Sequence, residues 1–302
     1  MSIASEITRI NQNIADAYTA LGTKGATLPQ SQNSANLVST INTVTTLDQY
    51  IEGEVTNYTG YATTVAENAL RNTSSLVSVN LPYAERVDRF GFAYCRNLES
   101  VRLDSCTYLH TEAFYDCSKL SSVYAPELLT AGGTYSAGQS GNFTYCYALK
   151  NVDFPKLQMV GVYDFSYSGV ENVNIPEVKE IYSYGFGNCQ SLKHIVLPKV
   201  EILGYSAFKD CKNLRRIDFH AITTHALDAY SGCTSLTELI IRRRLTYPIA
   251  GPGQSGTFTI PNNTIIYVEN ADLTWYQSTS GWSTFYDAGR IKSVDELPPL
   301  EE

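Results

Sequence analysis

The side chains best suited to metal binding or catalysis in this chain of 302 residues are four histidines and seven cysteines. The histidines are His110, His194, His220 and His225. Cys106 lies four residues before His110, and His220 lies five before His225, but neither pair completes the ligand set of a zinc site. A nucleophilic Ser or Cys would need a His and an orienting acid, and the sequence contains no nucleophile elbow. We therefore expect no metal site and no catalytic site.

One glycine pattern matches a cofactor motif by its letters. Gly251, Gly253 and Gly256 have the spacing GxGxxG of dinucleotide-binding loops. Such a loop must follow a strand and open a helix inside a βαβ unit, whereas the residues that follow here read TFTIP. A near copy, GQSG, occurs at 138–141, which indicates a recurring loop sequence. We expect no cofactor.

Six of the seven cysteines recur at one position of a repeat. Each unit opens on an aromatic or apolar residue, and these openers are Leu70, Phe92, Phe114, Phe143, Phe165, Phe186, Phe208 and Tyr230. Five of the seven steps between them are 22 residues long, and the other two are 21 and 29. The cysteine comes three residues after the opener, and Thr73 or Ser168 takes its place in two units. Eight copies at a fixed period indicate a solenoid whose coils bury their apolar residues against each other.

The unit from Phe186 to Phe208, FGNCQSLKHIVLPKVEILGYSAF, predicts the structure of one coil. The alternation in SLKHIVLP predicts a short strand with one buried face, and the proline ends it. The return segment, KVEILGYSAF, has a second apolar pair, a Gly turn and the pattern of a short helical or 3₁₀ piece.

The consensus AFxxCxxLxxVxLPxVxxIGxxAF resembles the BspA-like class of bacterial leucine-rich repeats, over about residues 66–242. The resemblance implies a right-handed leucine-rich-repeat solenoid with a parallel β-sheet on the concave face and short turns, 3₁₀ or helical pieces on the convex face. It also implies surface attachment and recognition of proteins or hosts, and no catalysis.

The repeated cysteines have two interpretations. Stacked cysteines could be about 5 Å apart, which a disulfide tolerates, but their Cα–Cβ bonds would run parallel and suit a bridge poorly. Because Thr73 and Ser168 occupy the same position, we interpret the cysteines as small buried packing residues.

We expect four segments: a helical N-terminal module at 1–45, a lead-in at 46–65, the solenoid at 66–245 and an α+β C-terminal cap at 246–302. The first has isoleucines at helical spacing and resembles the N-terminal module of tail-associated proteins of phages and prophages. It could cover the first coil or form a homo-oligomer. The cap, with the strand TIIYV and a short helix, resembles the terminal unit that often follows such repeats. We expect a frayed tail at 296–302.

Two surfaces are candidates for ligand binding. The outward side chains of the repeat strands form a polar strip, and the candidate site residues on it are Arg102, Tyr124, Asp153, Asn174, His194, Arg216 and Asp218. The alternative for this strip is an ordinary solvated sheet face. The rival surface is a set of tyrosines on the turns, namely Tyr94, Tyr115, Tyr145, Tyr147, Tyr167, Tyr182, Tyr184 and Tyr205, some of which must pack between coils.

Charge and hydropathy limit the function classes. The net charge of −8 argues against nucleic acid or an anionic membrane as a partner. No stretch approaches the roughly 20 apolar residues of a membrane span, and no signal peptide is visible. We therefore predict a non-enzymatic binding or adhesion protein that recognises protein or glycan on a host or neighbouring cell. The alternative is a structural part of a phage or prophage tail, which would make the protein virion-associated. An enzyme would need a pocket at the insertion of 129–143.

Overall fold

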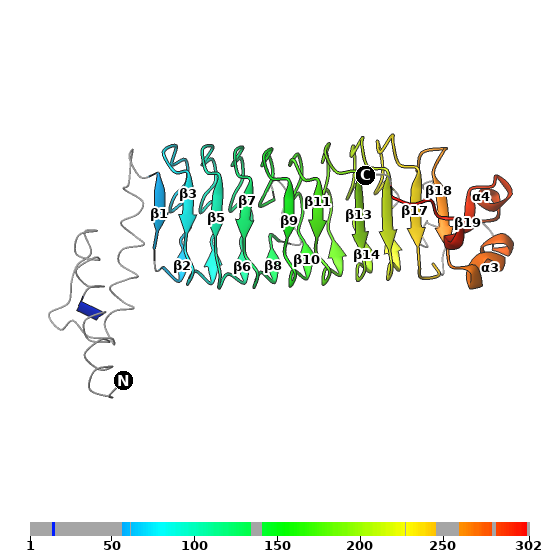
Figure 1. Ribbon diagram of the computed structural model, residues 1–302, viewed down its shortest axis with the longest axis horizontal. Helices are drawn as coiled ribbons and strands as arrows, with labels where there is room; N and C mark the ends of the chain where they lie inside the picture. The colour runs from blue at the N-terminus through cyan, green and yellow to red at the C-terminus, as the bar shows by residue number, and fades with distance from the viewer. Residues whose placement is uncertain are drawn as a thin grey trace, which may run out of the picture.

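The computed structural model describes residues 14–15, 56–60, 62–133, 141–226, 228–245, 260–279 and 282–300. The described residues from 56 to 245 form a solenoid of parallel strands, in which each repeat makes one coil (Figure 1). The prediction of a leucine-rich-repeat solenoid is therefore confirmed. The predicted N-terminal module at 1–45 lies outside the described residues, apart from Ile14 and Ala15.

The strands predicted from the repeat line one side of the solenoid, here called the first sheet, and hydrogen bonding divides them into three separate groups. They are β1 (Asn57–Thr59), β3 (Ser78–Asn80), β5 (Ser100–Arg102), β7 (Ser122–Tyr124), β9 (Asn151–Asp153), β11 (Asn172–Asn174), β13 (His194–Leu197), β15 (Arg216–Phe219) and β17 (Glu238–Ile241). Pairing is parallel and keeps the repeat in register, so that Val79 lies opposite Val101, and Val101 opposite Val123. This register points the second residue of every strand into the core and the first and third outward.

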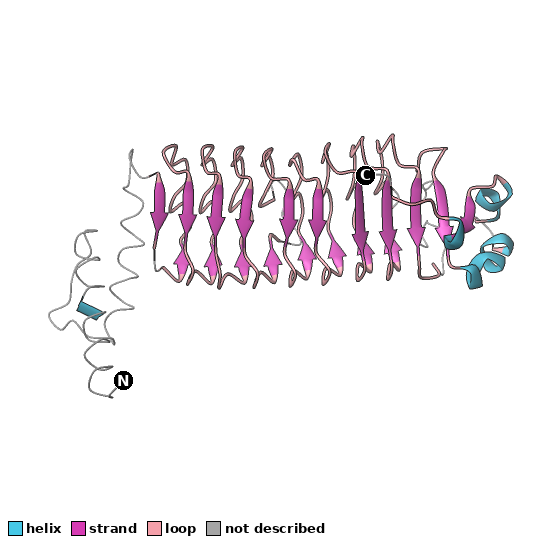
Figure 2. Ribbon diagram, in the orientation of Figure 1, coloured by secondary structure: helices cyan, strands magenta, loops and turns pink. Residues whose placement is uncertain are grey.

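A second sheet, made of shorter strands, lies on the return side of the coils (Figure 2). Its eight strands have two residues each: β2 (Thr64–Val65), β4 (Arg86–Val87), β6 (Tyr108–Leu109), β8 (Thr130–Ala131), β10 (Met159–Val160), β12 (Glu180–Ile181), β14 (Ile202–Leu203) and β16 (Thr224–His225). The sequence predicts short turns, 3₁₀ or helical pieces on this side. The turns are confirmed, and the two-residue strands between them are an addition that the sequence analysis did not expect. The reason is that one strand residue per coil, such as Val87 or Leu109, is buried, and the backbone can pair with the next coil.

The phenylalanines that open the repeats form the centre of the core. Neighbouring rings from Phe92 to Phe208 are nearly parallel, with centroids 5.1 to 5.5 Å apart. All are fully buried. The spacing is close to the roughly 4.8 Å between neighbouring strands, so each ring fills the space between its two neighbours.

The unit of 21 residues is shortened at Gly169. A Cβ atom at this position would lie 2.0 Å from the carbonyl oxygen of Tyr147 in the preceding coil. Because glycine has no Cβ, the backbone can approach closely, and the Gly169 amide donates a 3.1 Å hydrogen bond to the carbonyl of Cys146. Val170 thereby occupies the buried position that leucine takes in the other units.

The C-terminal cap extends the first sheet and adds helices. It comprises β18 (Ile265–Val268), η2 (Asn270–Asp272), α3 (Leu273–Ser278), α4 (Ser283–Asp287), β19 (Ile291–Ser293) and η3 (Val294–Glu296). β18 pairs with β17, and β19 pairs with β18, so the last repeat strand is not an exposed edge. Trp282 and Tyr276 are buried beneath the helices. The predicted α+β cap is confirmed.

Candidate binding face of the first sheet

The structure places the seven predicted site residues on the outward face of the first sheet, in two rows. Arg102, Tyr124, Asp153, Asn174 and Asp218 each occupy the third position of a strand, in one row. His194 and Arg216 occupy the first position and lie opposite each other in the second row. Whether they bind a ligand stays a prediction.

The open part of this face contains an arginine beside a tyrosine. Arg102 and Tyr124 are paired across β5 and β7, and the guanidinium carbon lies 4.5 Å from the centroid of the tyrosine ring. Arg102 also donates a 2.8 Å hydrogen bond to Asp104. Tyr124 is 47% exposed. A cation held against an exposed ring offers hydrogen-bond donors and an apolar surface at one place.

The next two strands carry amides and a carboxylate. The side-chain amide of Asn174 donates a 2.7 Å hydrogen bond to Asp153, and that of Asn172 donates a 2.8 Å bond to Asn151. These side chains are exposed, so they keep polar atoms toward solvent. Together with Arg102 and Tyr124, they form a polar surface that includes one aromatic residue.

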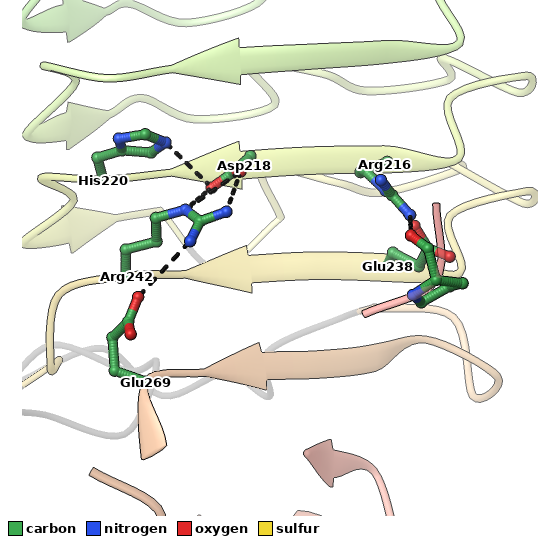
Figure 3. A network of polar contacts seen from close by, with 7 residues as sticks. Arg216, Asp218, His220, Glu238, Arg242 and Glu269 are labelled. Atoms are coloured by element: carbon green, nitrogen blue, oxygen red, sulfur yellow. Dashed lines mark hydrogen bonds and ion pairs between the residues drawn. The ribbon is translucent and has the colours of Figure 1, made fainter. Parts of the chain in front are cut away.

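The C-terminal end of the face is closed by ion pairs. Asp218, only 8% exposed, accepts two hydrogen bonds of 2.9 Å from Arg242, and His220 lies 3.4 Å from it. Glu269 lies 3.6 Å from Arg242 on the other side. The bond to Asp218 raises the pKa of the Arg242 guanidinium. Figure 3 shows this cluster at one end of the strands.

Arg216 and Glu238 form a separate ion pair at the other end of the same strands (Figure 3). Arg216 is 8% exposed and also donates a 2.6 Å hydrogen bond to the carbonyl oxygen of Pro298. The expectation of a frayed tail at 296–302 is therefore wrong for Pro298, which lies against the sheet. Sequence reasoning missed this contact because nothing in the tail pattern pairs it with the repeat.

The tyrosines on the turns form a continuous ladder of rings. Tyr94, Tyr115, Tyr145 and Tyr167 follow one another with centroids 5.2 to 5.5 Å apart. Three of them, Tyr94, Tyr145 and Tyr167, have φ between 58° and 64°, a left-handed conformation that costs roughly 1–2 kcal/mol. Ring contacts between coils offset that strain, so part of this set has a packing role.

Other members of the predicted tyrosine set lie outside this ladder. Tyr184 stacks on Tyr163, with centroids 4.8 Å apart, and Tyr182 donates a hydrogen bond to Glu180, which raises the pKa of Tyr182 to about 12. Tyr147 and Tyr205 are more than half exposed. Whether these rings take part in recognition stays a prediction.

The family model of the BspA-type leucine-rich repeat region matches this chain in six copies, over residues 54–156 and 138–249. The chain belongs to this family. A leucine-rich cell surface protein from Faecalibacterium prausnitzii has a similar fold, with a TM-score of 0.50 at 17% identity over 72% of this chain and 67% of that one. A leucine-rich repeat protein from T. pallidum reaches a TM-score of 0.45 at 21% identity, over 61% of this chain and 79% of that one. No curated protein matches the chain.

The family match begins at residue 54. The predicted resemblance of residues 1–45 to tail-associated modules therefore lies outside both the match and the described residues, except for Ile14 and Ala15. It stays a prediction, as does the oligomer through that segment.

The cysteine of the BspA-type repeat has a hydrogen-bonding role that the sequence did not reveal. Its thiol donates to the carbonyl oxygen of the opener one coil earlier, for example from Cys95 to Leu70 and from Cys211 to Phe186, both at 2.9 Å. All seven cysteines are free and buried, which confirms their interpretation as buried packing residues. Burial raises the pKa of the Cys95 thiol to about 12.

The base of the insertion contains a buried carboxylate. Asp164 accepts 3.1 Å hydrogen bonds from the backbone and side-chain amides of Asn142, and a 2.6 Å bond from the amide of Gly161. Asn142 in turn accepts from the amide of Ala113, so the end of the insertion is attached to two coils. Residues 134–140 are outside the described part, so the structure does not test the predicted pocket there.

The described residues also bear on metal binding and on membrane insertion. Within them, no group of three or more His, Cys, Asp or Glu side chains could hold a metal ion. No helix in this part of the chain combines the length and apolar character needed to cross a bilayer. The glycine pattern at 251–256 lies outside the described residues.

Proposed function

We propose that this BspA-type protein is a non-enzymatic binding protein at a bacterial cell surface, where the open part of the first sheet recognises protein or glycan. The observation that carries the proposal is the exposed group formed by Arg102, Tyr124, Asp153 and Asn174. The fold similarity to a leucine-rich cell surface protein supports the location.

The chemistry of this group suits recognition better than catalysis. Exposed amides and a carboxylate exchange hydrogen bonds with sugar hydroxyls or peptide groups, and an aromatic residue with a neighbouring guanidinium provides a contact with high area and low entropy cost. Solenoids use such extended faces for extended partners. His194 lies at the border of this group, whereas Arg216 and Asp218 are engaged in ion pairs at its C-terminal end.

The phage-tail alternative depends on the N-terminal segment, and the described residues contain no observation that favours it. We therefore propose a cell-surface location. We also propose the domain organisation given by the four segments expected from the sequence.

Matched surface variants provide the test. Full-length protein is passed over immobilised mucin, fibronectin and a panel of bacterial polysaccharides, and binding is measured by surface plasmon resonance. The double variant Arg102→Ser, Tyr124→Ser should weaken binding at least tenfold. Its control is Arg86→Ser, Tyr108→Ser on the second sheet, where Arg86 pairs with Asp88 as Arg102 pairs with Asp104.

The control should change binding less than twofold. Binding that resists the first-sheet variant, or that falls equally with the control, would contradict the proposed face. A reproducible hydrolase or transferase activity that one point change abolishes would contradict the non-enzymatic assignment.

A further inference from the structure

The C-terminal tail returns from the cap across the first sheet. After β19, the short helix η3 turns the chain, and Ser293 caps it by accepting a 3.1 Å hydrogen bond from the amide of Asp295. Glu296 completes a capping box with the amide of Ser293. In Figure 1 the red segment that follows leaves the cap helices and runs back over β17. These capping hydrogen bonds fix the turn, and the turn directs the tail onto the first sheet.

The tail is bound there through its backbone. The Nε atom of Arg216 contacts the Glu238 carboxylate, and its Nη2 atom donates a 2.6 Å hydrogen bond to the carbonyl oxygen of Pro298. Glu238 holds the guanidinium in place from the next strand, so the donor is positioned before any carbonyl arrives. Because a backbone carbonyl is present in every peptide, this contact does not depend on one particular side chain.

A pocket of about 160 Å³ lies between the tail and the sheet. Its walls are formed by two prolines and Leu300 of the tail on one side and by side chains around the starts of β13, β15 and β17 on the other, including Lys193, His194 and Arg215. Lys193 and Arg215 are exposed cations, and the sequence continues after Leu300 with Glu301 and Glu302. The charge of this surface is opposite to that of the two glutamates that follow Leu300 in the sequence.

From this geometry we propose that the region around Arg216, at β13 to β17, is a peptide-binding site for extended, acidic, proline-containing segments, and that the chain's own tail is its resident occupant. Two consecutive prolines favour an extended backbone, so a segment of this type loses little conformational entropy on binding. Pro298, Pro299 and Leu300 are largely exposed, which makes the tail exchangeable for a similar segment from outside. The site is separate from Arg102 and Tyr124, so it goes beyond the proposed function and can fail independently of it.

The test uses full-length protein and a fluorescein-labelled peptide of residues 295–302, DELPPLEE, with binding followed by fluorescence anisotropy. The unmodified chain should bind weakly, because its own tail is present at an effective concentration in the millimolar range. A tail variant with Pro298→Gly, Pro299→Gly and Leu300→Gly should bind the peptide at least tenfold more tightly. The single variant Leu300→Lys, at a position that is 52% exposed, puts a cation opposite Lys193 and Arg215 and is a milder form that leaves the cap intact.

Two further variants locate the binding. In the tail-variant background, Lys193→Glu should weaken binding about tenfold, while Lys179→Glu, an exposed lysine beside the second sheet, should have no effect. A peptide whose last two glutamates are replaced by lysines should also bind more weakly. Absence of peptide binding to tail variants that keep their thermal midpoint would overturn the proposal. Equal affinity for the unmodified chain and both tail variants would overturn it too, because the peptide would then bind elsewhere.

Discussion

The guanidinium of Arg216 donates a 2.6 Å hydrogen bond to the carbonyl oxygen of Pro298, which lies 82 residues later in the chain. This bond joins β15, the second-last repeat strand, to the segment that follows the cap. The first sheet therefore has two regions of different character. One is open and polar around Arg102, and the other is covered and held by ion pairs around Arg216.

The Arg216–Glu238 pair should contribute more to stability than the exposed ion pairs between coils. Its side chains are 10% and 18% exposed, whereas those of Lys199 and Glu177 are 51% and 46% exposed. Glu238→Gln leaves a nearly buried guanidinium without its anionic partner, and we expect a loss of about 2–4 kcal/mol in the free energy of unfolding, measured by urea denaturation. Glu177→Gln is the matched control and should cost less than about 1 kcal/mol. Equal losses in the two variants would refute this assignment.

The phenylalanine stack should be sensitive to a cavity at its centre. Phe165 lies between Phe143 and Phe186, with ring centroids 5.2 and 5.1 Å away. Phe165→Ala removes contacts on both sides, and we expect a loss of about 3–5 kcal/mol. Phe165→Leu keeps most of the volume and should cost less than half as much. Urea denaturation of both variants measures the difference, and an Ala variant no less stable than the Leu variant would argue against a close-packed stack.

The thiol of the repeat should act as a donor and not merely as a filler. Cys211 donates to the carbonyl oxygen of Phe186 at 2.9 Å. Cys211→Ala removes the donor and leaves a small void, so we expect a loss of about 1–2 kcal/mol. Cys211→Ser keeps a hydroxyl donor and should be less destabilising, and the buried Ser168 shows that a serine fits at the equivalent position. Thermal and urea unfolding of the Ala and Ser variants measures the difference in stability between them. A Ser variant as unstable as the Ala variant would mean that the hydrogen bond contributes nothing.

Asp164 should make stability depend on pH. Burial raises its pKa from 3.8 to about 7, against the effect of the amides of Asn142 and Gly161 that donate to it. The folded protein therefore holds the proton more tightly than the unfolded chain. The contribution of this group is complete below pH 3.8 and is lost as the pH rises through about 7.

The difference in unfolding free energy between the natural protein and Asp164→Asn should therefore fall by about 1 kcal/mol per pH unit between roughly pH 5 and 7. Urea denaturation of both proteins across this range measures it. A difference that stays constant or increases with pH would contradict the buried position of the carboxyl group.

The repeat alone was sufficient to predict the solenoid, the strands of the first sheet and the burial of Phe186 and its equivalents. The reason is that each coil is a local structure, and its neighbours in space are the same positions one period away. The return strands were not predicted, because a two-residue strand such as Ile202–Leu203 is too short for its pattern to differ from that of a turn.

The sequence by itself therefore determined the coil, its register and which side of each strand faces outward, since all three follow from a period of about 22 residues. Only the tertiary structure decided that Arg216 and Asp218, which the repeat places in the same strip as Arg102, are covered and paired. Pro298, which accepts from Arg216, lies in the tail outside the repeat, and Arg242, which donates to Asp218, follows the last repeat strand at a position that is not equivalent to Asp218. A periodic pattern specifies contacts between equivalent positions, whereas a contact between a repeat and a segment outside it depends on where the folded chain returns.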